Sequence, residues 1–157
     1  KARSSDLTLV IAGSGPYEKR MTETVLQENL PVVLLGFISD KEIVSRLMAK
    51  AQVFLAVGPI ETFGLAALES LASGTPVVAS NTSAVGEFLK TKDGNCVGLT
   101  ADNNGAAFAD AIEELLSLTN EDVQMRQRCR SQAENFPWSK TIFELNSLHQ
   151  PLPIKAA

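Results

Sequence analysis

Two glutamates and a glycine in one short segment have the types and spacing to bind an anionic ligand rich in hydroxyl groups. Glu61 follows an apolar run, and Glu69 lies eight residues further along the chain. Gly64 falls in the first turn of a helix predicted over 63–73, which Thr62 is placed to cap. Because a helix N-terminus carries unpaired N–H groups and about half a positive charge, it favours a phosphate group.

The predicted helix over 63–73 is apolar almost all round, and Glu69 is its only charged residue. Such a helix is expected to be buried, and an ionised carboxylate on it needs a polar partner. Two vicinal ribose hydroxyls would supply one. From the residues alone, a solvent-facing Glu69 or an ion pair with a lysine is an equal alternative. For Glu61, the equal alternative is an acidic residue that complements the helix dipole.

The strands and helices that position these residues are predicted from the sequence, in which apolar runs alternate with helical patterns. The runs show no period of two, which is typical of strands covered on both faces. The alternation predicts βαβ units, and therefore an α/β fold with a doubly wound, Rossmann-like parallel sheet. We expect a single domain over 1–157, of which 101–157 is a helical C-terminal tail. The predicted strands are 7–12, 32–35, 52–57, 76–79 and 96–99, and the predicted helices are 17–28, 40–50, 63–73, 84–90, 106–118, 121–135 and 138–148.

Local signals also predict how some of these elements begin. Ser39 and Glu42 form an S-x-x-E capping box for the helix over 40–50, and Asn120 is a suitable N-cap for the helix over 121–135. Ligands of open α/β sheets bind beyond the carboxyl ends of the strands, so the loops there carry the candidate sites. Gly13 and Gly15 lie in the first such loop, but Glu18 stands where a dinucleotide fingerprint needs its third glycine.

Composition and charge exclude several classes of function. The formal net charge is −4 with no basic block, which argues against a nucleic-acid partner. No apolar run approaches the length of a membrane span. Cys96 and Cys129 are far apart and are expected to be reduced thiols in a cytoplasmic protein. Since His149 is the only histidine, we expect no catalytic triad and no histidine-based metal site.

These motifs, in this order, resemble family 4 glycosyltransferases, which have the GT-B fold. The pair Glu61-x(7)-Glu69 lies within ETFGLAALESLASGTPVVAS, and the resemblance covers nearly the whole chain. It implies the C-terminal, sugar-nucleotide-binding half of a GT-B fold, and GPIETFGLAALE looks especially like mannosyltransferases that use GDP-mannose. The further segments that carry it are GSGP over 13–16, LLGFISD over 34–40, DGNCVGL over 93–99 and FPWS over 136–139.

The resemblance implies roles for the residues of the 61–69 segment. Glu61 would be the catalytic residue, accepting hydrogen bonds from hydroxyls of the donor sugar. The main-chain N–H groups of Phe63, Gly64 and Leu65 would face the sugar and the diphosphate. Glu69 would bind the ribose hydroxyls.

Four further donor-binding residues are implied in the first part of the chain. Gly13 and Gly15 would line the cleft near the phosphates. Ile38 would frame the base through its backbone, and Asp40 would read a base edge unless it is merely an acidic residue in the first turn of a helix. The substrate would be a nucleotide-diphosphate sugar, with no further cofactor. No metal would be needed if protein charges stabilise the leaving diphosphate, and the chain has no D-x-D sequence, which is consistent with this.

The resemblance also implies a partner domain, and the sequence departs from the family pattern at several places. The acceptor would be held by the protein's own N-terminal domain, absent here, and only that half would bring the enzyme to a membrane surface. Family members begin this domain with a further strand and helix that carry an Arg and a Lys, and no such unit precedes Leu7. Ser14 stands where many members have an acidic residue, and 81–86 lacks the usual glycine pair.

The missing unit would supply the central strand of the usual 3-2-1-4-5-6 order. We therefore expect a gap between the strands over 7–12 and 52–57, closed by direct pairing, by another chain or by the rest of a longer protein. We also expect no transferase activity from this chain alone. The alternatives are a GT-B epimerase or phosphorylase, and a non-catalytic nucleotide-binding or regulatory module.

Overall fold

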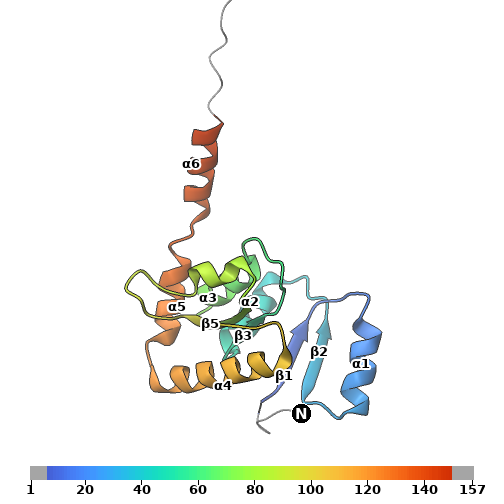
Figure 1. The fold of residues 1–157 in the computed structure, drawn as a ribbon. Helices are drawn as coiled ribbons and strands as arrows, with labels where there is room; N and C mark the ends of the chain where they lie inside the picture. Colours follow the sequence, from blue (N-terminus) through green and yellow to red (C-terminus); the bar gives the residue numbers. More distant parts are fainter. Residues whose placement is uncertain (1–6, 150–157) are drawn as a thin grey trace, which may run out of the picture. The chain divides into compact units, whose positions relative to one another are not determined.

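The computed structural model describes residues 7–149, in which parallel strands alternate with helices (Figure 1), so the predicted α/β fold class is confirmed. The ends of the predicted domain, 1–6 and 150–157, lie outside the described residues. Contacts divide the chain into two compact units, 1–47 and 48–157, and each is described by itself. The elements are β1 (Leu9–Ala12), α1 (Glu18–Gln27), β2 (Val32–Gly36), α2 (Lys41–Lys50), β3 (Phe54–Ala56), α3 (Leu65–Ala72), β4 (Val77–Ser80), η1 (Ala84–Phe88), β5 (Gly98–Ala101), α4 (Gly105–Glu121), α5 (Met125–Ala133) and α6 (Trp138–Leu148).

The first unit is a two-stranded parallel sheet with α1 beside it. In its register Leu9 lies opposite Val32 and Ile11 opposite Leu34, and an irregularity follows Ile11. Helix α1 has no buried residue, and the Val33 side chain of the sheet is 45% exposed. This unit therefore leaves much of its apolar surface uncovered by the described residues around it.

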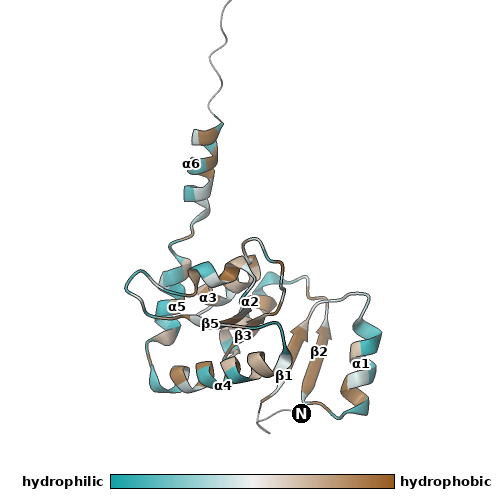
Figure 2. Ribbon diagram, viewed as in Figure 1, coloured by the Kyte–Doolittle hydropathy of each residue, from teal (hydrophilic) through white to brown (hydrophobic). Residues whose placement is uncertain are grey.

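The second unit holds the main core around a parallel sheet in the order β3-β4-β5. All four residues of the central strand β4 are buried. Figure 1 shows α3 on one side of these strands and α4 on the other, and Figure 2 shows the strands as apolar. Because β4 is covered on both faces, its run of apolar residues needs no polar alternation. The core consists of Ala67, Leu71, Val77, Val78, Ala79, Val85, Phe88, Leu89, Val97, Ala101, Ala111, Leu115, Met125 and Cys129.

Helix α5 attaches to this core through polar side chains as well as apolar ones. The buried Gln132 amide donates to the main-chain oxygens of Phe88 at 2.9 Å and Lys90 at 3.1 Å. The Arg126 guanidinium donates to the main-chain oxygens of Ala49 at 2.9 Å and Ala51 at 3.0 Å. Except for the exposed bond to Ala49, these bonds satisfy buried or partly buried carbonyl groups that would otherwise lose water on folding without a replacement.

The strand pairing follows the division into two units. Strand β1 pairs with β2 in the first unit, and strand β3 pairs with β4 in the second. The expected gap between the first and third strands concerns the placement of one unit against the other, and it stays a prediction.

Several element boundaries differ from the prediction. Helix α4 continues through Asn120, which is therefore not an N-cap, and ends at Glu121. Its C-cap is Asp122, whose Oδ1 accepts from the Gln124 N–H at 3.0 Å. The segment predicted as a helix over 84–90 is a shorter 3-10 helix. In contrast, α6 has the predicted bounds and buries none of its side chains. No helix in residues 7–149 is long and apolar enough to cross a membrane.

Candidate functional site

Glu61 lies on the loop between β3 and α3, where main-chain and side-chain contacts fix its backbone. Its side chain is exposed, and Oε1 accepts a hydrogen bond from the Phe63 N–H at 3.3 Å. Its main-chain oxygen accepts from the Ala84 N–H at 3.0 Å. The carboxylate keeps its second oxygen free of any hydrogen bond or ion pair with the described residues, so it can accept hydrogen bonds from a ligand.

Gly64 starts α3 in a conformation that glycine favours. It is the N-cap residue, with φ at 88° in the left-handed region. The helix therefore begins two residues later than predicted, and Thr62 does not cap it, since the cap has no side-chain hydrogen bond. A Cβ on Gly64 would also overlap Cγ2 of Val85. The backbone can take this path only because the residue has no side chain.

The N-terminus of α3 is open to an anion. Within residues 7–149, the N–H groups of Gly64, Leu65 and Ala66 donate no hydrogen bond. These groups carry the positive end of the helix dipole, which is worth about 0.3 to 2 kcal/mol to a nearby negative charge. A phosphate at this place would meet N–H donors that the fold has already oriented.

Glu61 and Gly64 line one hollow of about 190 Å³ beside β3. Strand β3 contributes all three of its residues to the lining, and the buried Val85 and Ala67 line it as well. The structure therefore places the predicted catalytic Glu61 beside Gly64 of the predicted diphosphate-binding turn. Phe63 and Leu65 do not line the hollow, and the Phe63 N–H is donated to Glu61 Oε1. The hollow combines apolar walls with a carboxylate and main-chain N–H groups, as small-molecule sites commonly do.

Glu69 stands one turn into α3 and outside that hollow. Its carboxylate is exposed and makes no hydrogen bond or ion pair with the described residues, whereas its main-chain oxygen accepts from the Ser73 hydroxyl at 2.9 Å. The helix rises about 6 Å from Leu65 to Glu69, so a ligand with phosphates at the N-terminus can reach it with its ribose. Without a ligand, Glu69 therefore faces solvent and forms no ion pair with a lysine of the described residues, and ribose binding stays a prediction.

Phe63 supports the site from its apolar side. Its ring centroid lies 6.0 Å from that of Phe88 and 6.1 Å from that of Phe136. Phe88 and Phe136 are themselves 5.6 Å apart, so the three rings form one cluster. Aromatic pairs at such distances add about 0.5 to 1.5 kcal/mol each beyond the area they bury. The cluster holds the residue that immediately precedes Gly64.

The other four predicted donor-binding residues belong to the unit of residues 1–47. Gly13 has φ at 136° and donates its N–H to the Gly36 oxygen at 2.7 Å, and Gly15 accepts from the Glu18 N–H at 3.1 Å. Ile38 is half-buried between β2 and α2. Asp40 Oδ1 accepts from the N–H groups that begin α2, which makes Asp40 the cap in place of Ser39.

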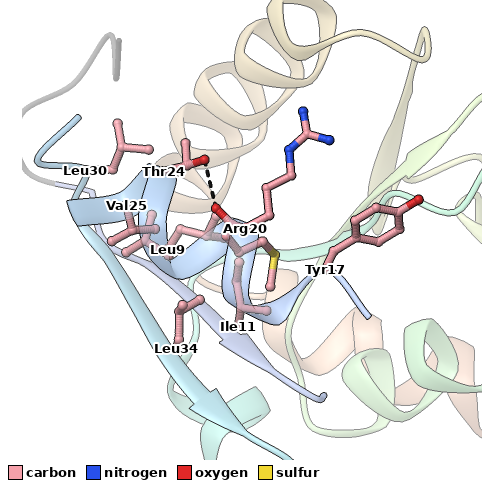
Figure 3. Close-up of a pocket in the computed structure, with 10 residues that line it drawn as sticks. Leu9, Ile11, Tyr17, Arg20, Thr24, Val25, Leu30 and Leu34 are labelled. Atoms are coloured by element: carbon pink, nitrogen blue, oxygen red, sulfur yellow. Dashed lines mark hydrogen bonds between the residues drawn. The ribbon is translucent and has the colours of Figure 1, made fainter. Parts of the chain in front are cut away.

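A larger hollow, of about 360 Å³, lies in that same unit between α1 and the sheet (Figure 3). It is lined almost wholly by apolar side chains, among them Leu9, Ile11 and Val25, with the Arg20 guanidinium and the Thr24 hydroxyl near it. None of the predicted site residues lines it. It has too few polar groups to orient a sugar nucleotide.

A polar cluster beside the Glu61 loop was missed by the sequence reasoning. It consists of Ser80, Thr82 and Asn103, which follow or end the neighbouring strands β4 and β5. The Thr82 hydroxyl donates to the Pro59 oxygen at 2.8 Å. Polar residues directly after two adjacent parallel strands were the available signal, because such ends meet at one edge of a sheet.

Asp93 and Cys129, whose pKa values are shifted by their surroundings, lie away from this site. A hydrogen bond from the Thr91 hydroxyl, followed by those from the backbone and Asn95, lowers the pKa of Asp93. Burial raises the pKa of Cys129 to about 12. Within residues 7–149, no group of three or more His, Cys, Asp or Glu side chains is arranged to hold a metal ion.

Solved structures define the class of protein to which this fold belongs. The sucrose-phosphate synthase from Thermosynechococcus elongatus has a TM-score of 0.75 at 25% identity, covering 90% of this chain and 37% of that one. TarM has a TM-score of 0.75 at 19% identity, covering 94% and 29%. The fold is that of the GT-B glycosyltransferases.

The model of the family described as Glycosyl transferases group 1 matches residues 1–136, and this chain belongs to that family. It is 46% identical over 136 residues to a GDP-mannose-dependent alpha-(1-6)-phosphatidylinositol dimannoside mannosyltransferase of Mycobacterium tuberculosis, covering 86% of this chain and 33% of that protein. A D-inositol 3-phosphate glycosyltransferase of Corynebacterium urealyticum is 34% identical over 90% of this chain and 34% of its own length. The chain thus spans about a third of the length of these relatives, and the predicted family is confirmed.

Proposed function

We propose that this chain supplies the sugar-nucleotide-binding part of a retaining, metal-independent hexosyltransferase. The observation that carries the proposal is the hollow at which the Glu61 carboxylate meets the open N-terminus of α3. A diphosphate is the anion that suits those N–H groups, and a sugar is the neighbour that suits a carboxylate with a free oxygen. Glu69, one turn further along, then binds the ribose.

We further propose GDP-mannose as the donor. The support is the mannosyltransferase of M. tuberculosis, whose name gives GDP-mannose as its donor and a phosphatidylinositol dimannoside as its acceptor. In this proposal the remaining two thirds of the protein hold the acceptor. A lipid acceptor would also place a cytoplasmic enzyme at the membrane surface.

The proposed transfer uses the fixed dipole of α3 rather than a metal ion. The bond between the anomeric carbon and the diphosphate oxygen breaks, and its electron pair leaves with the diphosphate, whose growing charge the N–H groups of α3 stabilise. The acceptor hydroxyl bonds to the anomeric carbon on the same face, which retains configuration, and its proton passes to the departing diphosphate. Glu61 orients the sugar through its hydroxyls.

Binding to the 157-residue chain tests the donor site directly. We expect isothermal titration calorimetry to detect GDP-mannose and GDP but not NAD. Glu69→Ala should weaken both ligands about tenfold or more, because a hydrogen bond to a charged group is worth about 1.5 to 3 kcal/mol. Glu61→Ala should weaken GDP-mannose while leaving GDP unchanged. Glu113→Ala, which removes an exposed carboxylate from α4, is the matched control and should change neither.

Activity measurements in the whole protein then test the chemistry. The isolated chain should bind donor without turning it over, whereas the full-length enzyme should transfer the sugar with retained anomeric configuration and in the presence of EDTA. There, Glu61→Ala should lower kcat more than donor affinity. Failure of the wild-type chain to bind any sugar nucleotide, or equally tight binding of NAD, would refute the proposal. Epimerised sugar nucleotide as the product would instead favour a GT-B epimerase.

A further inference from the structure

The loop that follows β4 holds the Glu61 loop at two main-chain oxygens. The Thr82 hydroxyl donates to the Pro59 oxygen at 2.8 Å, and the Ala84 N–H donates to the Glu61 oxygen at 3.0 Å. The two bonds lie on either side of Ile60, so they bracket the approach to the candidate catalytic residue. The path of residues 59–61 is therefore set by a neighbouring loop, not by the strand from which it emerges.

Packing contributes little to holding this loop in place. Pro59, Glu61 and Thr62 are all exposed, and the Ile60 side chain is 92% exposed. An exposed side chain gains little from burial, so the hydrogen bonds decide the conformation of the loop. Removing one of the two main-chain bonds would leave the Glu61 carboxylate on a segment with a single remaining attachment to the 82–84 loop.

The side chains of Ser80 and Asn103 form hydrogen bonds with the Thr82 hydroxyl and so influence where it donates its proton. Ser80 is fully buried and donates its own proton to Asn103 Oδ1 at 2.5 Å, while Asn103 Nδ2 donates to Thr82 Oγ1 at 3.1 Å. Thr82 Oγ1 thus already accepts a hydrogen bond, and each hydroxyl has only one proton to give. The Thr82 proton has two acceptors within reach, the Pro59 oxygen at 2.8 Å and Ser80 Oγ at 2.9 Å. Because Ser80 Oγ already accepts from the Thr82 N–H at 3.2 Å, the bond to the Pro59 oxygen is the favoured one. Three side chains from two strand ends cooperate to make that one bond.

We propose that Thr82 is a positioning residue for Glu61, with Ser80 and Asn103 orienting its hydroxyl. The inference rests on the proposed function, because it assigns Thr82 to the sugar part of the same donor site. Thr82 itself need not touch the donor. Its effect is to keep the Glu61 carboxylate beside the N-terminus of α3, where the sugar and the diphosphate are bound together.

The test separates sugar recognition from nucleotide recognition. In Thr82→Val, which keeps the shape and removes the hydroxyl, the affinity of the chain for GDP-mannose should fall about threefold to tenfold, as expected for one lost hydrogen bond. The affinity for GDP should not change. Thr82→Ser should restore GDP-mannose binding. In a Glu61→Ala background, Thr82→Val should have no further effect, because the group it positions is gone.

A matched control and a ligand-free readout complete the experiment. Thr119→Val removes another hydroxyl-to-carbonyl bond, from Thr119 to the Leu115 oxygen at 2.7 Å in α4, and should leave both affinities unchanged. Amide hydrogen exchange at Ala84 should become faster in Thr82→Val, since the two bonds hold the same loop. Equal changes for GDP and GDP-mannose, or no change for either, would overturn the positioning role. A wild-type chain that binds neither probe would instead overturn the proposed function.

Discussion

Replacing Gly64 with alanine should destabilise the fold through two separate effects. At a φ of 88° an alanine lies in the left-handed region, which costs about 1 to 2 kcal/mol. Its methyl group would also overlap Cγ2 of the fully buried Val85, and overpacking of a well-packed core costs about 1 to 3 kcal/mol. We therefore expect Gly64→Ala to lower the free energy of unfolding by about 2 to 5 kcal/mol.

Urea unfolding followed by far-ultraviolet circular dichroism measures this loss. A second substitution separates the part of this loss that comes from the steric overlap, because Val85→Ala removes the methyl group that the new side chain would meet. In that background Gly64→Ala should cost only the backbone part, about 1 to 2 kcal/mol. Gly105→Ala is the control, since a Cβ there meets nothing within 4 Å. If Gly64→Ala has the same cost in the wild-type and Val85→Ala backgrounds, the steric argument is refuted. If it has no cost in either background, both the steric and the backbone argument are refuted.

Two further substitutions and two treatments test other contacts. Asp40→Ala removes the cap of α2 and should cost about 0.5 to 2 kcal/mol of stability in thermal unfolding, whereas Asp40→Asn should retain most of it. Gln132→Leu leaves two buried or half-buried carbonyls of the 88–90 segment without their donor and should cost about 1 to 3 kcal/mol in the same assay. Cys129 should resist iodoacetamide at pH 8 in the folded chain while Cys96 reacts, because burial raises the pKa of Cys129 to about 12. Because folding raises this pKa, the thiol of Cys129 contributes fully to the free energy of unfolding below pH 9, and this contribution is lost as the pH rises toward 12. The free energy of unfolding measured at pH 8 and at pH 10.5 tests this loss.

The order of elements and the family could be predicted because they depend on local patterns. The helix over 138–148 was predicted at its observed bounds, and all five strands lie at or within two residues of their predicted positions. The pair Glu61 and Glu69, with Gly64 between them, was enough to locate the candidate site. These features follow from hydrophobic runs and from motif spacing, which the chain carries in sequence.

The features that the sequence did not predict correctly depend on tertiary contacts. Thr62 has the right side chain for a cap, but Gly64 takes that position because the backbone must pass close to Val85. Likewise, Ser80 and Asn103 meet because the register of β4 on β5 places Ser80 opposite Ala101. The polar residues at the two strand ends point to one edge of the sheet, but which of these side chains meet depends on the register, which no local pattern reports.

The ring of Phe136 gives the domain a practical boundary. Phe136 is the last residue that the family model matches, and its ring lies 6.1 Å from that of Phe63, the neighbour of Gly64. A shortened version that ends just after Phe136 would keep this aromatic contact and, of the described elements, lose only α6, which buries none of its side chains. A version that ends one residue earlier would lose the Phe136 ring and leave Phe63 with Phe88 as its aromatic neighbour, 6.0 Å away. The position of the stop codon would thus decide whether the ring beside Gly64 has one aromatic neighbour or two.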